Sequence, residues 1–155
     1  MKKLFCAATA ALCLTAPTQA VTEAEAKAVV VELFNAMRAG DGAAIKAMVV
    51  DDARLDRLQP DGTLRQGPFD RWINWVDQQE QGDADEQIFG VEVLSMSPEL
   101  ATVWAPFTIT YKGELRGCGV NQFTLGKTAD GWRVLYGIDM PSQEDCATFP
   151  NKFKD

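Results

Sequence analysis

The stretch that decides the fold runs from Ala28 to Leu58 and reads AVVVELFNAMRAGDGAAIKAMVVDDARLDRL. It predicts an amphipathic helix, a break at Gly40-Asp41, a short second helix, the acidic pair Asp51-Asp52 and then a strand. This order is typical of a half-open cone, in which a curved sheet wraps around a long helix. We therefore expect the architecture, rather than the chemistry, to be the firmest result of the sequence.

Three helices are predicted from caps and from apolar residues at helical spacing. Thr22 and Glu25 form a capping box for the long helix, and Asp41 caps the short one. Pro68 occupies the first turn of a third helix, where its missing N–H costs nothing. The apolar stripes of the long and third helices are Val30, Leu33, Phe34 and Met37, and Phe69, Trp72, Ile73 and Val76.

The remaining segments predict strands. We expect strands over 53–58, 63–66, 87–96, 101–111, 114–128 and 132–140, with residues 78–86 as a polar, solvated connection. Pro106 donates no ladder hydrogen bond and indicates a bulge or an edge strand. The order is α-α-β-β-α-β-β-β-β, an α+β cone with three N-terminal helices on a curved, mostly antiparallel sheet that ends in a four-strand meander.

The N-terminus has the pattern of a secretory signal. Lys2 and Lys3 precede an apolar run from Leu4 to Ala16 that is too short to span a bilayer, and Thr18-Gln19-Ala20 fits cleavage after Ala20. The alternative is a buried N-terminal helix. We expect a signal peptide over 1–20, one domain over 21–146, a tail over 147–155, and a soluble periplasmic or secreted mature chain.

Net charge limits the classes of possible partner, and the cysteine content predicts a disulfide. Cleavage would lower the net charge from −7 to −9, which disfavours nucleic acid and anionic lipid headgroups as partners. No later apolar run is long enough to cross a membrane, so we expect no membrane insertion of the mature chain. Cys118 and Cys146, 28 residues apart, would remain as one pair. We expect a disulfide, worth roughly 3–4 kcal/mol in the chain-entropy model.

The chain contains no histidine. Catalysis by Ser-His-Asp or Cys-His groups and ordinary zinc sites are therefore excluded. Proton transfer would depend on carboxylates, lysines, Tyr111 or Tyr136. Asp51-Asp52 could suggest a metal, but adjacent acids before a strand are more often caps or solvated turns, so we predict no metal site and no cofactor.

The chain resembles the nuclear transport factor 2-like superfamily, which includes ketosteroid isomerase, scytalone dehydratase and the SnoaL-like polyketide cyclases. The resemblance covers residues 22–146 and rests on the order of Ala39-Gly40-Asp41, Asp51-Asp52-Ala53, Gly67-Pro68-Phe69 and Ala129-Asp130-Gly131-Trp132. The segments Val103–Phe107, Cys118–Phe123 and Cys146 look like an exported bacterial subgroup of uncharacterised members, except that Gly117 stands where that subgroup has a histidine. The resemblance implies a conical pocket, often in homodimers paired through the outer face of the sheet.

Steroid isomerisation is disfavoured. That chemistry needs a carboxylate base and an oxyanion hole of a tyrosine and a protonated aspartate. The resemblance places Leu33 at the position of the tyrosine, Arg57 at that of the base and Asn121 at that of the protonated aspartate. Leu33 and Arg57 cannot take over those roles, and Asn121 keeps a hydrogen-bond donor but cannot act as an acid.

A different polar pair remains. If Ala129-Asp130-Gly131 is a three-residue loop, Asn121 lies opposite Asp139, and a desolvated Asp139 could act as general base beside the Asn121 amide. The alternative is that Asp139 is a solvated strand end and Asn121 bonds to backbone. A two-residue loop would shift the register by one.

The remaining site candidates are side chains expected to face the cone. Arg57 could attract an anionic ligand or pair with Asp56 or another carboxylate. The four tryptophans are expected in the core and at a dimer surface, although one or two could line the cone, since such pockets are mostly aromatic: Trp72, Trp75, Trp104 and Trp132. The predicted pocket-lining residues are Leu33, Met37, Arg57, Trp72, Phe107, Asn121, Phe123 and Asp139.

Three functions are compatible with this pattern. The first is an exported homodimer that binds a small, largely apolar molecule in an apolar conical pocket, with no established reaction. The second is a cofactor-free isomerase, dehydratase or cyclase with Asp139 as base and Asn121 as polariser. The third is a protein–protein module that uses the outer sheet face.

Overall fold

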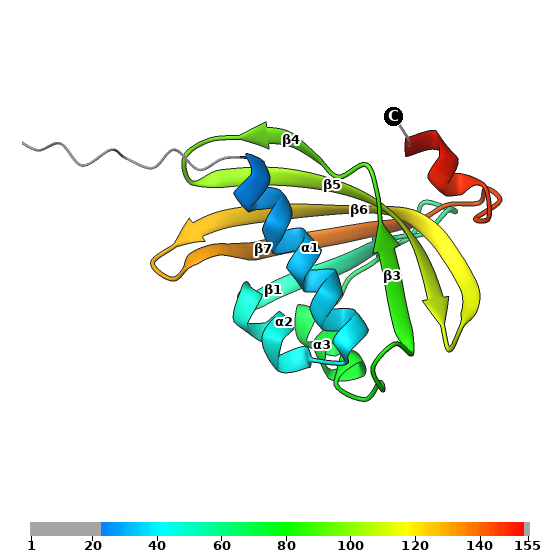
Figure 1. The fold of residues 1–155 in the computed structure, drawn as a ribbon. Coiled ribbons are helices and arrows are strands. Elements are labelled where there is room, and N and C mark those ends of the chain that lie inside the picture. The colour runs from blue at the N-terminus through cyan, green and yellow to red at the C-terminus, as the bar shows by residue number, and fades with distance from the viewer. Residues whose placement is uncertain (1–22, 154–155) are drawn as a thin grey trace, which may run out of the picture.

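A computed structural model describes residues 23–153 (Figure 1). The predicted signal peptide, its cleavage site and Thr22 of the capping box lie outside these residues. The helical elements are α1 (Glu23–Ala39), α2 (Gly42–Met48), α3 (Phe69–Val76) and the 3₁₀ helix η1 (Phe149–Phe153). The strands are β1 (Val49–Leu58), β2 (Leu64–Arg65), β3 (Ala84–Ile88), β4 (Glu92–Met96), β5 (Leu100–Tyr111), β6 (Glu114–Thr128) and β7 (Gly131–Pro141).

The helices form where caps and apolar stripes predict them. Asp41 accepts a hydrogen bond from the Ala44 amide at 2.8 Å and so caps α2. Gly40, with φ of +70°, lets the chain reverse between α1 and α2, and the carbonyl of Gln79 leaves no room there for a side chain. The buried residues of α1 are Ala26, Val30, Leu33, Phe34, Ala36 and Met37, which include its whole predicted stripe.

One sheet holds all the strands. Its order is β2-β1-β7-β6-β5-β3, and β4 also pairs with β5. Every pairing is antiparallel except that of β1 with β7, which is parallel. The predicted α+β cone with three helices on a curved sheet is confirmed.

The segment 87–96 is not one strand, as predicted, but parts of two. Strands β3 and β4 are separated at Gly90, with φ of +53°, and both pair with the same edge of β5. Strand β3 also begins earlier, at Ala84, so the expectation of a solvated connection up to Glu86 is wrong for its last three residues.

Pro106 lies in an interior strand, not at an edge. Its carbonyl accepts a hydrogen bond from the Phe89 amide at 3.0 Å, so this residue faces the break between β3 and β4. No regular ladder crosses that break, and the missing N–H of proline therefore costs little. The β5–β6 bulge lies further on, between Ile109 and Thr110.

The last hairpin combines two deviations that cancel. Thr128 pairs with Gly131, which makes the turn two residues long and not three as predicted. A bulge then shifts the register beyond Thr124, where Leu125 pairs with Val134 but Thr124 pairs with Tyr136. Asn121 consequently pairs with Asp139, as predicted from the other loop length.

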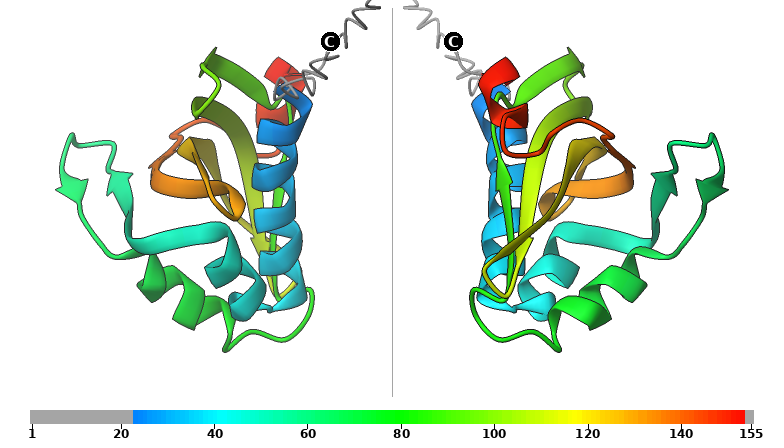
Figure 2. Two further views of the ribbon diagram at one scale, coloured as in Figure 1. Left: turned by 90° about the vertical axis from the view of Figure 1, so that its left-hand side faces the viewer. Right: turned by 90° about the vertical axis from the view of Figure 1, so that its right-hand side faces the viewer.

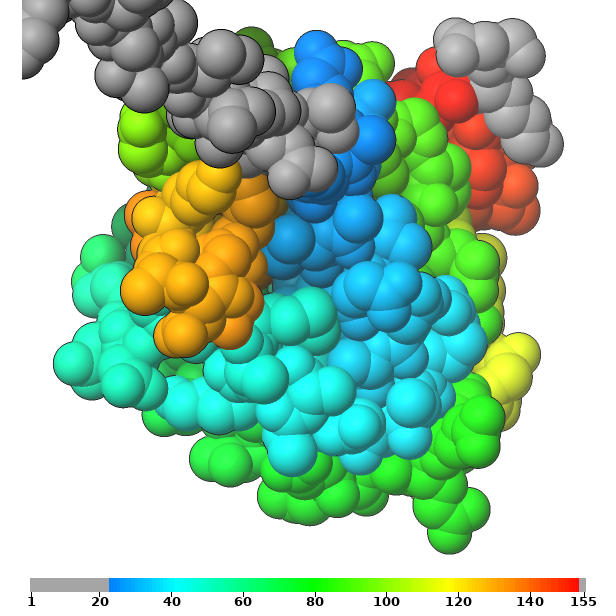
Figure 3. All heavy atoms as spheres, turned by 60° about the vertical axis from the view of Figure 1, so that its left-hand side comes forward, coloured from blue at the N-terminus to red at the C-terminus, as the bar shows by residue number. Residues whose placement is uncertain are grey.

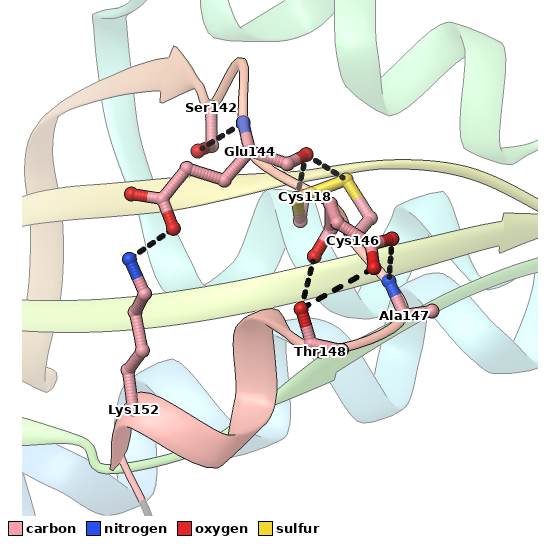
Figure 4. The surroundings of a disulfide bond; sticks show 8 residues. Cys118, Ser142, Glu144, Cys146, Ala147, Thr148 and Lys152 are labelled. Atoms are coloured by element: carbon pink, nitrogen blue, oxygen red, sulfur yellow. Dashed lines mark hydrogen bonds and ion pairs between the residues drawn. A yellow bond between two sulfur atoms is a disulfide. The ribbon is translucent and has the colours of Figure 1, made fainter.

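The C-terminal segment packs on the domain and is not only a tail. Phe149 is buried, and its ring meets those of Phe89 and Phe153 at 6.2 and 5.3 Å between centroids. Cys118 of β6 is joined to Cys146 just before η1 (Figure 4). The predicted disulfide is thus present, and it indicates a compartment outside the cytoplasm.

Two further views show how the layers open. Edge-on, α1 runs along one side while β1 and β2 project on the other, with α3 below them (Figure 2). On another face, α1 and α2 lie beside the tip of the β6–β7 hairpin (Figure 3). Within residues 23–153 no helix has the length and apolar character needed to cross a membrane.

Candidate functional site

A cavity of about 290 Å³ opens between α1, α3 and the concave side of the sheet. That volume is at the lower end of the range for small-molecule sites. Seven elements or their connections contribute to its wall, so the cavity exists only in the assembled fold. Its lining residues are Phe34, Leu55, Asp56, Arg57, Arg65, Gln66, Gly67, Phe69, Arg71, Trp72, Glu86, Asn121, Phe123 and Asp139.

One wall of the cavity is aromatic. The ring of Phe34 from α1 meets Trp72 of α3 and Phe123 of β6 edge to face, at 6.4 and 6.0 Å between centroids. Phe69 packs on Trp72 in the same manner at 5.6 Å. Edge-to-face rings hold one another in place, so this wall of the cavity is preformed and apolar.

A row of polar side chains crosses the sheet opposite the rings. Strand register places Arg57 beside Asp139 and Asp139 beside Asn121. The Arg57 Nε donates to both carboxylate oxygens of Asp139 at 2.9 Å, and its Nη2 donates to Oδ2. These hydrogen bonds to Asp139 raise the pKa of the Arg57 guanidinium, although desolvation acts against them. Arg57 thus both lines the cavity and makes an ion pair.

Glu86 of β3 completes the row, and it is the residue that sequence reasoning missed. Only 8% of it is exposed, and Oε1 accepts a hydrogen bond from Nδ2 of Asn121 at 2.7 Å. Desolvation raises the pKa of Glu86 from 4.5 to about 8, with a contribution from the charge of Asp139, against the opposing effects of Asn121 and Arg57. The carboxyl is therefore mostly protonated at neutral pH.

The sequence signal that could have indicated the burial of Glu86 is a short alternation of residues between the two sides of β3. Ala84, Glu86 and Ile88 share one side of β3, while Asp85 and Gln87 face the other way. Because the segment follows a polar run and contains three consecutive polar residues, the alternation is weak, and we expected a solvated connection.

Asp56, a second buried carboxylate, lies at the rim of the cavity. Its oxygens accept hydrogen bonds from the Gly67 amide at 3.1 Å, Arg54 Nη2 at 3.0 Å and the Tyr136 hydroxyl at 3.1 Å. Burial alone would raise the pKa of Asp56, but these three donors lower it below 3.8. The cluster ties β1 to β7 and to the segment before α3, so its role is structural.

The structure brings five of the eight predicted pocket residues to the cavity. The other three are buried elsewhere and do not line the cavity. Leu33 and Met37 belong to the hydrophobic core, and Phe107 is buried in β5 near the break between β3 and β4. Those at the cavity are Arg57, Trp72, Asn121, Phe123 and Asp139.

The remaining candidates lie elsewhere. Asp51 and Asp52 are exposed in a bulge of β1, which begins at Val49 and not at Ala53, and Asp52 has a φ of +59°. Trp104 lines a second, apolar groove on the outer sheet face, and Trp132 is buried. Across residues 23–153 no three potential metal-binding side chains of the His, Cys, Asp or Glu type come together.

The overall structure is similar to solved structures of NTF2-like proteins. One is an NTF2-like protein of unknown function from Shewanella baltica OS155, at 15% identity and a TM-score of 0.55, covering 80% of this chain and 99% of that one. Another, with a cystatin-like fold, is from Novosphingobium aromaticivorans, at 13% identity and a TM-score of 0.62, covering 85% and 88%. A protein described as "a putative dehydratase from the NTF2-like family", from Streptomyces avermitilis, has 17% identity and a TM-score of 0.63, covering 79% and 96%.

These similarities confirm the fold but no activity, since identity is low and one fold hosts many functions. No curated protein matches the chain significantly. A family model described as "Putative lumazine-binding" matches residues 21–136, which includes α1 through most of β7 and nearly the whole cavity. The chain therefore belongs to the family with that description, and its fold is that of the NTF2-like proteins.

Proposed function

We propose that the chain binds a small molecule with a flat, largely apolar body in the cavity between α1, α3 and the sheet. The observation that carries this proposal is the cavity itself, with aromatic rings on one wall and a polar row on the other. A few converging polar groups on an apolar site are the usual arrangement of a ligand pocket.

The family description suggests lumazine-like heterocycles as the first ligands to test. A bicyclic heteroaromatic ring offers a flat face to Phe34 and Trp72 and hydrogen-bonding edges to Glu86 and Asn121. Protonated Glu86 supplies a donor, and the Asn121 amide supplies both a donor and an acceptor.

The test is a thermal-shift screen of lumazine, related pteridines and small aromatic compounds, followed by calorimetry of the best ligand. Phe123→Ala removes one aromatic ring from the cavity wall and should weaken binding at least tenfold. Thr124→Ala, the next residue along β6, lies outside the lining of this cavity and of the outer groove, so it is the matched control and should leave affinity unchanged. Absence of any shift across the screen would count against a binding role.

A second candidate function is acid–base catalysis, an isomerase, dehydratase or cyclase reaction without cofactor. Here the geometry favours Glu86 over the predicted Asp139, because Arg57 occupies both oxygens of Asp139 whereas Glu86 has one hydrogen bond and a pKa of about 8. An acid or base with a pKa near the working pH is the most effective. With an identified substrate, kcat/KM should change near pH 8, and Glu86→Gln should abolish turnover; unchanged turnover would exclude this role.

The cellular setting and the oligomeric state are part of the same proposal. We expect cleavage after Ala20 and a periplasmic or secreted protein, which the disulfide supports. We also expect a homodimer through the outer sheet face, where Trp104, Val120, Ile138 and Met140 line an apolar groove. Light scattering of the purified protein and of Met140→Glu tests the dimer, and N-terminal sequencing of the exported chain tests the cleavage site.

A further inference from the structure

Arginines gather at the cavity of an otherwise acidic chain. The chain has a net charge of −7, yet four of its seven arginines fall between Arg54 and Arg71. Three of these, Arg57, Arg65 and Arg71, line the cavity. A positive site within a negative surface attracts anions selectively, because the local field differs in sign from the rest of the molecule.

Two of the four arginines already have partners. Arg57 is paired with Asp139, and Arg54 with Asp56. Each pair leaves no net charge. These two arginines are accordingly accounted for by the fold, and neither requires a ligand.

Arg65 and Arg71 differ, because neither side chain makes a hydrogen bond or ion pair within residues 23–153. Arg65 adds to the lowering of the pKa of exposed Asp61, where the amide and hydroxyl of Thr63 are the larger causes. The guanidinium of Arg71 lies over Gly67, with Nη1 3.2 Å from the position that a Cβ would take there. Both arginines are exposed at the rim formed by β2 and the start of α3.

The carboxylates of the cavity do not neutralise them. Asp56 and Asp139 are matched by Arg54 and Arg57, and Glu86 is mostly protonated at neutral pH among Asn121, Asp139 and Arg57. Arg65 and Arg71 therefore have no carboxylate partner within the cavity lining, and Asp61, on which Arg65 acts, lies outside that lining. Guanidinium groups of this kind match the two oxygens of a carboxylate in geometry as well as in charge.

We propose that the ligand is an aromatic carboxylate, with its ring among Phe34, Trp72 and Phe123 and its carboxylate held at the rim by Arg65 and Arg71. This inference rests on the proposed binding function and specifies its ligand class. The cavity volume of about 290 Å³ limits the aromatic body to one or two rings.

The experiment compares an anionic and a neutral probe of nearly the same shape, 2-naphthoate and 2-naphthamide, by isothermal titration calorimetry at pH 7. The chain should bind the carboxylate at least tenfold more tightly than the amide. The double variant Arg65→Gln/Arg71→Gln should lose that preference while it still binds the amide. Raising the salt concentration should reduce the preference in the unmodified chain only.

Arg116→Gln is the matched control. Arg116 is exposed and pairs with Glu114 at the β5–β6 turn, outside the cavity lining. The substitution removes one positive charge from the chain without changing the rim, so it should leave the tenfold preference for 2-naphthoate intact. Circular dichroism of each variant verifies that the fold is retained.

The possible results separate this inference from the binding function on which it rests. Equal affinity for both probes would overturn the assignment of an anionic ligand and leave the binding function standing. A preference for the carboxylate that survives the double variant would overturn the role of Arg65 and Arg71. Failure of both probes to bind would count against the binding function as well.

Discussion

Two buried carboxylates, Asp56 on β1 and Glu86 on β3, behave in opposite ways. Asp56, 3% exposed, accepts hydrogen bonds from three different groups, and its pKa is lowered below 3.8. Glu86, 8% exposed, accepts one, and its pKa is raised to about 8. Burial is similar, so the number and charge of the donors account for the difference.

The comparison indicates which polar groups belong to the fold and which are available to a ligand. A carboxylate that receives an arginine, an amide and a hydroxyl is fully satisfied as an anion. A carboxyl with one neutral donor is left to hold a proton, and it keeps hydrogen-bonding capacity for a molecule in the cavity. Burial of such a carboxyl destabilises the folded chain. A destabilising residue of this kind is expected where the side chain serves a function and not the fold.

The largest effect should come from Glu86→Gln, measured as unfolding free energy against pH. Because the pKa of Glu86 is raised, the folded chain holds a proton that the unfolded chain loses, so stability falls as pH rises from about 4.5 to about 8. The full loss has an upper bound of about 5 kcal/mol. The glutamine variant should lack this decline and be more stable than the parent above pH 8.

Asp85→Asn is the control for that measurement. Asp85 lies on the other side of β3 and pairs with Arg38 at 2.5 Å in a partly exposed position. Its removal should change stability by less than about 1 kcal/mol and leave the decline between pH 4.5 and 8 in place. A Glu86→Gln variant with the same pH profile as the parent would contradict the raised pKa.

The next effect should come from Asp56→Ala, with the opposite sign at neutral pH. Removal of this carboxylate leaves the Gly67 amide and the Tyr136 hydroxyl without their partner, and Arg54 without its counter-ion. We expect a loss of about 3 kcal/mol in urea unfolding at pH 7. Because the pKa of Asp56 is lowered, this contribution should be present above about pH 4 and disappear on acidification.

Asp130→Ala serves as the control for this loss, since Asp130 is exposed in the β6–β7 turn. It should change stability by at most about 0.5 kcal/mol. A loss of less than about 1 kcal/mol for Asp56→Ala would show that the cluster does not hold β1 in place.

A smaller effect is expected from Tyr136→Phe, which removes one of the three donors to Asp56. The loss should be about 1 kcal/mol, the usual net value of one hydrogen bond. The pKa of Asp56 should rise toward its ordinary value, measured by NMR titration of the carboxyl carbon. An unchanged pKa would mean that the amide and the arginine alone account for the lowering.

The smallest effect on stability should come from Asn121→Ala, because Glu86 is already protonated at neutral pH and gains little from the amide. We expect at most about 1 kcal/mol at pH 6. The pKa of Glu86 should rise further, since the Asn121 hydrogen bond lowers it. A fall in that pKa, measured by the same NMR titration, would reverse the assigned role of the amide.

Much of the fold follows from local pattern. The stripe of α1, the Asp41 cap, the third helix and the cysteine pair were predictable, because helical periodicity, caps and cysteine counts are properties of neighbouring residues or of composition. The pairing of Asn121 with Asp139 was also predicted, but from a three-residue loop that does not exist. The bulge beside Leu125 restored it, and no sequence signal specifies that bulge.

The sequence by itself determined an α+β cone with one disulfide, and it supplied most of the cavity's aromatic and polar side chains. Only the tertiary structure decided that Glu86 is buried, that Arg57 binds Asp139, and that Arg65 and Arg71 are left unpaired at the rim. The physical reason is that the proton affinity and charge balance of a side chain depend on neighbours from other strands. Those neighbours are distant along the chain and are brought together only by the register of the sheet.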